Sequence, residues 1–255
     1  MRFSANLGFL YTDLSLPDAV KAAKDGGFDA VECHFPYDTP PEDLQAALDK
    51  TGLQMLALNT WPGHRDAGDF GLAALPDRAE EARAEIGRAV DFAAATGITF
   101  IHVMAGLTDG GHAAEDQFRA NLDHACDLAS AHGMTVLIEP INTRDVPGYH
   151  LSGTDHAEEI LTALDRPELK IMFDCYHMQI MQGDLAASIE RLLPMIGHIQ
   201  IAAAHDRGEP DTGEIDYAWL MSHLERLGFD GYVGAEYKPR KTTVEGLGWL
   251  NRFRG

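Results

Sequence analysis

Short runs of apolar residues recur along the chain, and several of them follow a glycine that closes a helix-like segment. Examples are "GGFDAVECHF", "TGITFIHVMAG", "HGMTVLIEP" and "LGFDGYVGAE", in which the apolar residues stay together instead of alternating with polar ones. Unbroken runs of this kind are typical of strands that are buried on both faces of a parallel sheet. Glycine suits the preceding position because it accepts the left-handed conformation after the last helical residue. The pattern predicts a repeated unit of helix and strand.

The segments between these runs are amphipathic and carry helix start and stop signals. The stretch "PDRAEEARAEIGRAVDFAAATG" begins with Pro76 and Asp77, has acidic residues in its first turns and ends at Gly97. Proline and acids at the start and glycine after the end are the usual helix boundaries. The stretch "EDQFRANLDHACDLASAHG" has the same form and ends at Gly133, while "LPDAVKAAKDGG" and "PEDLQAALDKTG" are shorter versions. These segments are predicted to be helices.

The apolar runs give eight candidate strands, separated by helices. They begin near Phe3, Ala30, Gln54, Thr99, Thr135, Lys170, His198 and Tyr232. Such alternation, without a proline- or serine-rich linker, favours an α/β fold of the (β/α)₈ TIM-barrel type. We expect residues 1–255 to form a single domain. A doubly wound open sheet is the alternative.

The charge of the chain narrows the partners that we expect. Lys and Arg total 20 and Asp and Glu total 40, which gives a net charge of −20. A negative field repels phosphate backbones and anionic lipid surfaces, so neither nucleic acid nor a membrane is an expected partner. The three cysteines are odd in number and far apart, which fits a reducing compartment, and the first residues lack the features of a signal peptide. We therefore expect a cytoplasmic protein. The sequence permits a homo-oligomer but does not fix the oligomeric state.

Four consecutive predicted strands carry an acid or an amide at or near their ends. The run "TVLIE" ends on Glu139, "LKIMFD" ends on Asp174, "HIQIA" contains Gln200 and "YVGAE" ends on Glu236. Active sites of barrels lie at the C-terminal ends of the strands. Three carboxylates that meet there cannot all stay ionised without a counter-charge, and oxygen ligands suit a divalent metal, with Mg²⁺ or Mn²⁺ ahead of Zn²⁺ or Co²⁺. Any one of these acids alone could instead be a helix cap or a loop charge.

Two further polar residues have both a functional and an ordinary interpretation. His177 follows Asp174 by three residues, so it could hold a substrate oxygen or shuttle a proton, or it could cap the next helix. Arg207, in the loop after the seventh strand, could clamp a substrate carboxylate. It could equally be a solvated charge that pairs with Glu209 or Glu214.

Other polar residues fall inside or near the ends of predicted strands. Asn6 and Asn59 lie near the ends of the first and third strands and are expected to line a pocket. His102 lies inside the fourth strand, in "FIHVMAG", and His34 has a similar setting in "VECHFPYD". We expect both histidines to be hydrogen-bonded core residues rather than ligands.

The motifs "LIEPINTRDVPGY", "FDCYHMQIMQGDL", "GHIQIA", "GEIDY" and "GYVGAEYKP" resemble those of the hydroxypyruvate isomerase family, within the xylose-isomerase-like TIM barrels. The resemblance covers essentially the whole chain and extends to the 2-oxo-tetronate isomerases. It implies that Glu139, Asp174, Gln200 and Glu236 bind a metal and that Glu139 and Glu236 form the acid–base pair. One departure is Ala203, where the family tends to have aspartate.

The resemblance implies a metal-dependent intramolecular oxidoreductase, an aldose–ketose type isomerase. The expected reaction interconverts hydroxypyruvate and tartronate semialdehyde by proton transfer through an enediolate. The expected substrate is a small anionic hydroxy-keto acid, bound by His177, Arg207, Asn6 and Asn59. A 2-oxo-tetronate isomerase is the first alternative and a sugar 3-epimerase the next. A nuclease of the endonuclease IV type and a non-catalytic metabolite-binding barrel are the alternatives from other classes, and the charge and the glutamine at 200 argue against the nuclease.

Overall fold

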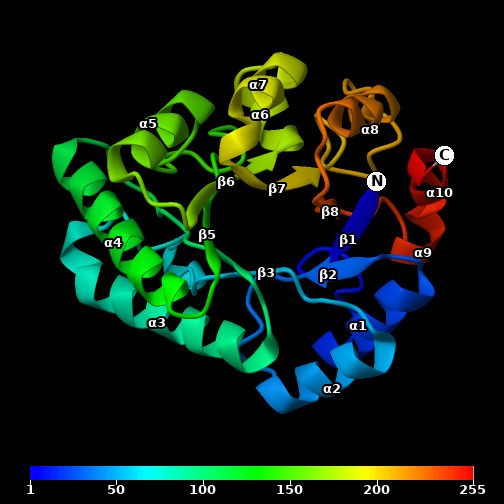
Figure 1. Ribbon diagram of the computed structural model, residues 1–255, viewed down its shortest axis with the longest axis horizontal. Coiled ribbons are helices and arrows are strands. Elements are labelled where there is room, and N and C mark those ends of the chain that lie inside the picture. The colour runs from blue at the N-terminus through cyan, green and yellow to red at the C-terminus, as the bar shows by residue number, and fades with distance from the viewer. Residues whose placement is uncertain (255) are drawn as a thin grey trace.

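The computed structural model describes residues 1–254 of the chain. Within these residues, eight parallel strands form one sheet in the order β2-β1-β8-β7-β6-β5-β4-β3. The strands are β1 (Arg2–Asn6), β2 (Ala30–Glu32), β3 (Ala57–Asn59), β4 (Phe100–His102), β5 (Thr135–Ile138), β6 (Leu169–Asp174), β7 (Ile196–Ile201) and β8 (Tyr232–Ala235). The helices form a ring around them (Figure 1). The predicted single TIM barrel is confirmed.

The two end strands of this order meet and nearly close the barrel. Val31 of β2 forms a parallel bridge with Met55, just before β3. The amide of Val31 donates to the carbonyl of Gln54 at 2.9 Å, and the amide of Leu56 donates to the carbonyl of Val31 at 2.7 Å. The alternative of a doubly wound open sheet is therefore wrong. The third strand begins later than predicted, at Ala57 rather than at Gln54, because residues 54–56 contribute only this short bridge.

The helices follow the predicted amphipathic segments closely. The α-helices are α1 (Leu16–Asp25), α2 (Pro41–Thr51), α3 (Ala79–Thr96), α4 (His112–Ser130), α5 (Thr154–Leu164), α6 (Cys175–Met181), α7 (Leu185–Leu192), α8 (Tyr217–Arg226), α9 (Thr243–Gly246) and α10 (Gly248–Arg254). Short 3₁₀ turns are η1 (Arg65–Ala67), η2 (Pro76–Arg78) and η3 (Leu193–Met195). Gly97 ends α3 in the left-handed conformation, with φ of 68°, as its position after the helix predicts. None of the helices among residues 1–254 has the length and apolar character that crossing a membrane requires.

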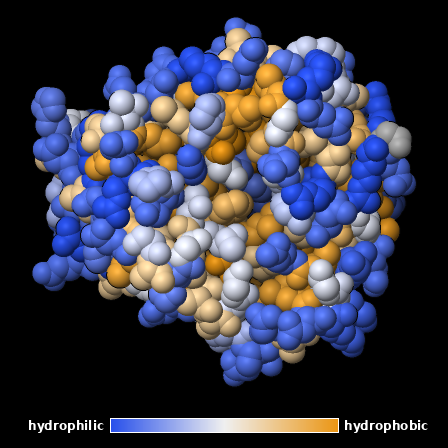
Figure 2. Space-filling model, viewed as in Figure 1, coloured by the Kyte–Doolittle hydropathy of each residue, from blue (hydrophilic) through white to orange (hydrophobic). Residues whose placement is uncertain are grey.

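The core lies between the strands and the inner faces of the helices. Fully buried side chains such as Phe3, Phe118 and Phe173 belong to one continuous apolar cluster. Hydrophilic residues predominate around the rim of the molecule, and hydrophobic ones gather nearer the middle of this face (Figure 2). Burial of such side chains contributes about 1.5–3 kcal/mol each and holds the strands in place. Trp249 of α10 packs edge-on against Phe3 of β1, with ring centroids 5.4 Å apart, which ties the end of the chain to its beginning.

Two glycines allow the loops after β3 and β4 to touch at the mouth of the barrel. Gly71 has φ of 110° and Gly106 has φ of 106°. A Cβ atom on Gly71 would lie 2.7 Å from the Gly106 nitrogen and the Met104 oxygen, and one on Gly106 would lie 2.6 Å from the Gly71 oxygen. Only glycine combines this backbone conformation with so close an approach. This contact fixes the loops that border the site described next.

Candidate active site

The four residues at the predicted strand ends come together at the C-terminal mouth of the barrel. Glu139 directly follows β5, Asp174 ends β6, Gln200 lies in β7 beside Asp174, and Glu236 directly follows β8. All four are buried, with exposed fractions of 5%, 0%, 2% and 5% in that order. Oxygens of Glu139, Asp174 and Glu236 lie within 4.8 Å of one another, together with a ring nitrogen of His177. The structure thus brings together the four residues that the sequence predicted to meet.

Several oxygens in this cluster are buried without a hydrogen-bond partner in residues 1–254. They are Glu139 Oε1, Asp174 Oδ2 and Gln200 Oε1. Asp174 also caps α6, because its Oδ1 accepts from the amide of Tyr176 at 2.8 Å. Oδ1 of Asp174 is therefore a helix cap, while its Oδ2 has no partner within the described residues. Buried oxygens without partners are rare in folded proteins and need an explanation.

Burial and mutual repulsion separate the acidities of the carboxyl groups. Burial raises the pKa of Glu139 well above its usual range, and nearby Glu236 and Asp174 raise it further. Burial also raises the pKa of Asp174, to about 7, against the opposing effect of Arg207. Burial would raise the pKa of Glu236 too, but Arg207 and His34 outweigh it and hold that pKa at about 2. Burial and the neighbouring carboxylates thus favour the protonated form of Glu139, whereas Arg207 and His34 favour the ionised form of Glu236.

His177 lies within α6 and faces the carboxyl groups. Its Nε2 is 3.6 Å from Glu139 Oε1 and 3.5 Å from Asp174 Oδ2. Its Nδ1 lies 3.3 Å from the backbone nitrogen of Asn142 and 2.6 Å from the side-chain nitrogen of the same residue, so Nδ1 is the acceptor. Burial lowers the pKa of His177 to about 3 and keeps the ring neutral. The ring therefore carries its proton on Nε2, where it can donate to an oxygen but has no lone pair for a metal. Asp174, not His177, caps the helix.

Arg207 reaches into the cluster from the loop after β7. Its guanidinium pairs with Glu236 and lies 3.6 Å from Asp174 Oδ2. The expectation that it could pair with Glu209 or Glu214 is wrong, because Glu209 is bound by Arg240 at 3.0 Å instead. The backbone of Arg207 has φ of 55°, a costly conformation for this residue. Hydrogen bonds from its amide to Ala203 and from the Lys238 amide to its carbonyl hold it there.

A layer below the cluster contains Glu32, which the sequence reasoning missed. Each oxygen of Glu32 accepts two hydrogen bonds. Oε2 accepts from His198 Nε2 at 2.6 Å and Ser4 Oγ at 3.1 Å, and Oε1 accepts from Gln200 Nε2 at 2.9 Å and Asn6 Nδ2 at 3.2 Å. Because Glu32 binds the nitrogen of the Gln200 amide, the unpartnered oxygen of that amide is turned away from it. The signal in the sequence was an acid at the end of a buried strand, "AVE", like the others.

The interpretation of His102 and His34 as hydrogen-bonded core residues holds only in part, because His102 is buried without a hydrogen bond and His34 is hydrogen-bonded but only half-buried. Neither ring nitrogen of His102 has a hydrogen-bond partner among residues 1–254, and its Nδ1 lies 3.6 Å from Glu139 Oε2. Burial lowers the pKa of His102 to about 4. His34 Nε2 lies 3.0 Å from Glu236 Oε1. Both rings border the active-site cavity, because His102 ends β4 and His34 lies just beyond the end of β2.

A cavity of about 430 Å³ opens above the cluster. Its volume is within the range of small-molecule sites. Asn59 lines the cavity as predicted, whereas Asn6 lies below it and donates to Glu236 Oε1 at 2.9 Å. Arg65 and Lys238 also line it, and neither side chain forms an ion pair within the described residues. The sequence reasoning did not include these two cations in the site.

The residues of the cluster fit a divalent cation. Three buried oxygens lack partners, they come from three neighbouring strands, and two of them belong to carboxyl groups that repel each other. Carboxylate and amide oxygens are the ligands that Mg²⁺ and Mn²⁺ prefer. A cation would supply both the missing partners and the counter-charge. Ala203, the departure from the family pattern, is buried and does not line the cavity, so it leaves this ligand set unchanged.

The closed barrel and the polar cluster at its C-terminal mouth define a TIM-barrel enzyme. Residues 20–253 match the family described as xylose isomerase-like TIM barrel, and the chain belongs to this family. It is 46% identical to the 2-oxo-tetronate isomerase of Cupriavidus necator over 257 residues, covering 100% of this chain and 99% of that protein. It is 39% identical to the hydroxypyruvate isomerase of Escherichia coli K12 over 258 residues, covering 100% of both.

A solved structure has the same architecture throughout. The crystal structure described as an AP endonuclease, family 2, from Brucella melitensis superposes with a TM-score of 0.95 at 38% identity, covering 100% of this chain and 99% of that one. The resemblance that the sequence motifs indicated is thus confirmed. The chain is an isomerase of the xylose isomerase-like family.

Proposed function

We propose that this isomerase acts on a small 2-keto acid with a hydroxyl group on the neighbouring carbon and interconverts it with the corresponding hydroxy-aldehyde. The observation that carries the proposal is the buried cluster in which Glu139, Asp174 and Gln200 each hold an oxygen without a partner. Glu139, Asp174, Gln200 and Glu236 would hold a divalent metal, with Mg²⁺ or Mn²⁺ ahead of Zn²⁺ or Co²⁺. Such a cation, when bound, acts as a Lewis acid that favours negative charge on substrate oxygens.

The two glutamates divide the acid and base roles. Glu236, with a pKa held at about 2, is ionised and suited to remove a proton. Glu139, with its pKa raised by burial and by neighbouring carboxylates, is suited to deliver one. In the direction from hydroxypyruvate, Glu236 takes the proton from the hydroxyl-bearing carbon and leaves an enediolate. Glu139 then protonates the former carbonyl carbon, and the hydroxyl proton passes to the former carbonyl oxygen, which completes tartronate semialdehyde.

Neighbouring residues orient the substrate for this transfer. His177 presents an Nε2 proton toward the carboxyl groups and can donate it to a substrate oxygen as a hydrogen bond. Arg207 lies close to both Glu236 and Asp174, so a substrate oxygen bound between them would meet a fixed positive charge. Asn6 holds Glu236 by a hydrogen bond of 2.9 Å and so fixes the base, while Asn59 borders the space above.

The substrate carboxylate requires a local positive charge because the chain carries a net charge of −20. Arg65 and Lys238 line the cavity, and their positive groups lie near aromatic rings instead of carboxylates. Arg65 lies 5.5 Å from the centre of the Phe70 ring, and Lys238 lies 5.9 Å from that of Phe9. These cations, with Arg207, are suited to bind a carboxylate, and salt limits the repulsion of the distant acidic surface to about 8 Å.

Hydroxypyruvate is the first candidate substrate and a 2-oxo-tetronate is the second. Two observations support the 2-oxo-tetronate as a candidate. The chain is 46% identical to a 2-oxo-tetronate isomerase, and the cavity of about 430 Å³ has room for more than a three-carbon acid. The test is a substrate panel with metal-stripped protein, to which Mg²⁺, Mn²⁺, Co²⁺ or Zn²⁺ is added back. We expect no turnover without a cation and restored turnover with one. Turnover of neither acid with any of these cations would contradict the proposal.

The acid–base roles have a separate test. Glu236→Gln removes the base but keeps the size of the side chain, and we expect kcat to fall by about 10²–10⁴-fold. The matched control is Glu159→Gln, because Glu159 is exposed on α5. Retained turnover in the Glu236→Gln protein with cation still bound would contradict the role of Glu236.

DNA is a poor alternative substrate, although the Brucella structure is described as an endonuclease. A net charge of −20 opposes the approach of a phosphate backbone, and binding of DNA depends on positive charge. A gel shift at low salt is expected to show no complex.

A further inference from the structure

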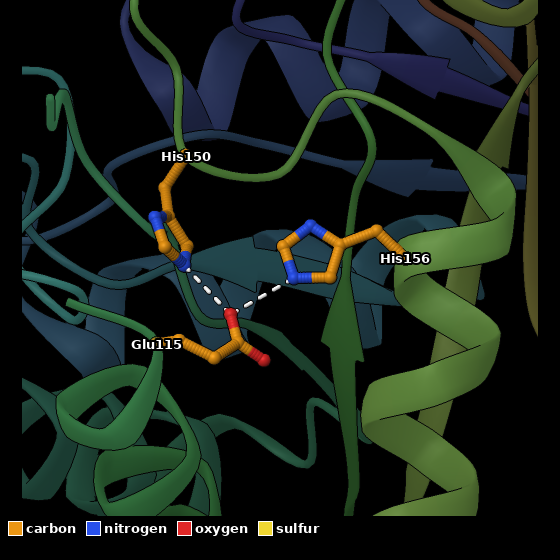
Figure 3. Close-up of side chains that lie close together, drawn as sticks. All are labelled: Glu115, His150 and His156. Atoms are coloured by element: carbon orange, nitrogen blue, oxygen red, sulfur yellow. Dashed lines mark hydrogen bonds and ion pairs between the residues drawn. The ribbon is translucent and has the colours of Figure 1, made fainter. Parts of the chain in front are cut away.

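A second cluster of metal-ligating side chains lies outside the barrel mouth. Glu115 comes from the first turn of α4, His150 from the loop before α5, and His156 from the first turn of α5. Both imidazole rings turn a nitrogen toward the same carboxylate oxygen (Figure 3). His150 Nε2 lies 3.0 Å and His156 Nε2 lies 2.8 Å from Glu115 Oε2. The three ligand atoms all lie within 4.8 Å of one another.

The backbone fixes His150 at this place. Leu107 and Tyr149 form an antiparallel bridge between the loop after β4 and the loop after β5. The His150 amide donates to the carbonyl of Gly106 at 2.9 Å, and the Thr108 amide donates to the carbonyl of Gly148 at 2.9 Å. The His150 ring also packs edge-on against Phe118, with ring centroids 5.5 Å apart. The ring is therefore held by packing on one side and by its hydrogen bonds on the other.

The outer atoms of His150 and Glu115 have the partners that metal ligands usually have. His150 Nδ1 lies 3.0 Å from the hydroxyl of Thr108, which can accept or donate. Without a cation, Nε2 donates to Glu115 Oε2; a shift of the ring proton to Nδ1, where the Thr108 hydroxyl can accept it, would free the Nε2 lone pair for a cation. Glu115 Oε1 accepts from Arg119 Nε at 2.5 Å, which leaves Oε2 turned toward the histidines.

We propose that Glu115, His150 and His156 form a binding site for a transition-metal cation of the Zn²⁺ type. Two imidazoles and one carboxylate bind Zn²⁺ at about 2.0–2.2 Å, in a tetrahedral arrangement that leaves a fourth position for water. In that arrangement ligand atoms lie about 3.4 Å apart, so the atoms seen at 2.8 and 3.0 Å need to separate by only a few tenths of an ångström. The His156 side chain is 33% exposed, which gives a cation access from solvent.

This site differs in chemistry from the one at the barrel mouth. Imidazole nitrogens suit Zn²⁺, Cu²⁺ and Ni²⁺, whereas the mouth offers carboxylate and amide oxygens. A bound cation would join α4, α5 and the loop that runs from Glu139 at the end of β5 to His150. Binding of the cation would stabilise this loop against opening, because it would link three segments of the chain. The inference does not depend on the proposed substrate or on the acid–base roles.

The experiment measures Zn²⁺ bound per chain after metal stripping, incubation with Zn²⁺ alone and gel filtration. The variants are His156→Gln and Glu115→Gln, with His132→Gln as the matched control, since His132 is exposed beyond the opposite end of α4. We expect both site variants to bind one Zn²⁺ fewer than the wild type and the control, and to lose part of the rise in Tm that Zn²⁺ causes. Equal Zn²⁺ content in all four proteins would overturn the proposal.

A spectroscopic measurement on the wild type covers the case in which a site variant fails to fold. The wild-type protein with one equivalent of Cu²⁺ is examined by electron paramagnetic resonance. Coupling to two imidazole nitrogens is expected from this site, because the predicted ligands at the mouth are oxygens. A Cu²⁺ spectrum without two coupled nitrogens would contradict the assignment.

Discussion

Replacement of Glu32 by glutamine tests whether the layer below the active site positions Gln200. Glu32 is buried and accepts four hydrogen bonds, two on each oxygen. Glutamine has the same shape, but its amide nitrogen would replace one of the two accepting oxygens of Glu32. This nitrogen is a donor and would face two other donors. The donors that would lose their acceptor are His198 and Ser4 if the nitrogen replaces Oε2, or Gln200 and Asn6 if it replaces Oε1. The substitution therefore changes the hydrogen bonding without opening a cavity.

The magnitude follows from the number of bonds. A hydrogen bond to a charged group contributes about 1.5–3 kcal/mol, so the loss of two corresponds to about 3–6 kcal/mol. The Ser4 hydroxyl can rotate to accept and recovers part of this. We expect the free energy of unfolding of metal-free Glu32→Gln protein to fall by about 2–4 kcal/mol. Loss of an outer partner of a metal ligand typically lowers affinity by about 10–100-fold, and we expect that loss for Mn²⁺ because Gln200 is no longer held.

The assay pairs urea denaturation of the metal-free proteins with calorimetric titration of Mn²⁺. Glu159→Gln on the exposed face of α5 is the control and should change stability by no more than about 0.5 kcal/mol. An unchanged urea slope would show that the same two states are compared. If Glu32→Gln protein matched the wild type in both stability and Mn²⁺ affinity, the reasoning that Glu32 orients Gln200 would be refuted.

Three further predictions concern charge and backbone. Arg207→Gln should raise the pKa of Glu236, because burial raises that pKa and Arg207 opposes the effect of burial. The acidic limb of the pH profile of kcat/KM should therefore move to higher pH. An unmoved limb would argue against Glu236 as the base. Cation binding at neutral pH should release protons, because the pKa of Asp174 is raised to about 7 and a ligand carboxyl group must lose its proton. Calorimetric titrations in buffers of different ionisation enthalpy measure this release, and identical heats would count against it. Gly71→Ala should destabilise the fold by more than about 1 kcal/mol, because φ at this position is 110° and a Cβ atom would lie 2.7 Å from backbone atoms. An unchanged midpoint of urea denaturation would contradict this prediction.

The fold was predictable because its signals are local. Unbroken apolar runs, several of them after a glycine that follows a helix, indicated the eight strands. The start of β3 was misplaced because only a short bridge forms at Met55. Glu139, Asp174 and Glu236 were found because each stands where an apolar run ends. Their convergence follows from the closed barrel.

The remaining site residues depend on contacts across the barrel, which no local pattern encodes. Glu32 of β2 meets Gln200 of β7, far away in sequence but adjacent below the mouth. His102 was interpreted as a core residue because its neighbours in the sequence are apolar, whereas its ring borders the cavity beside Glu139. In the same way, His150 and His156 gave no signal in the sequence, because Glu115 joins them from another helix.

The most direct test of the central claim is a crystal structure with Mn²⁺, in which anomalous scattering locates the cation. We expect a strong anomalous peak at the barrel mouth, with oxygens of Glu139, Asp174, Gln200 and Glu236 as its ligands. A mouth without a cation, in crystals of protein that turns over its substrate, would contradict the account.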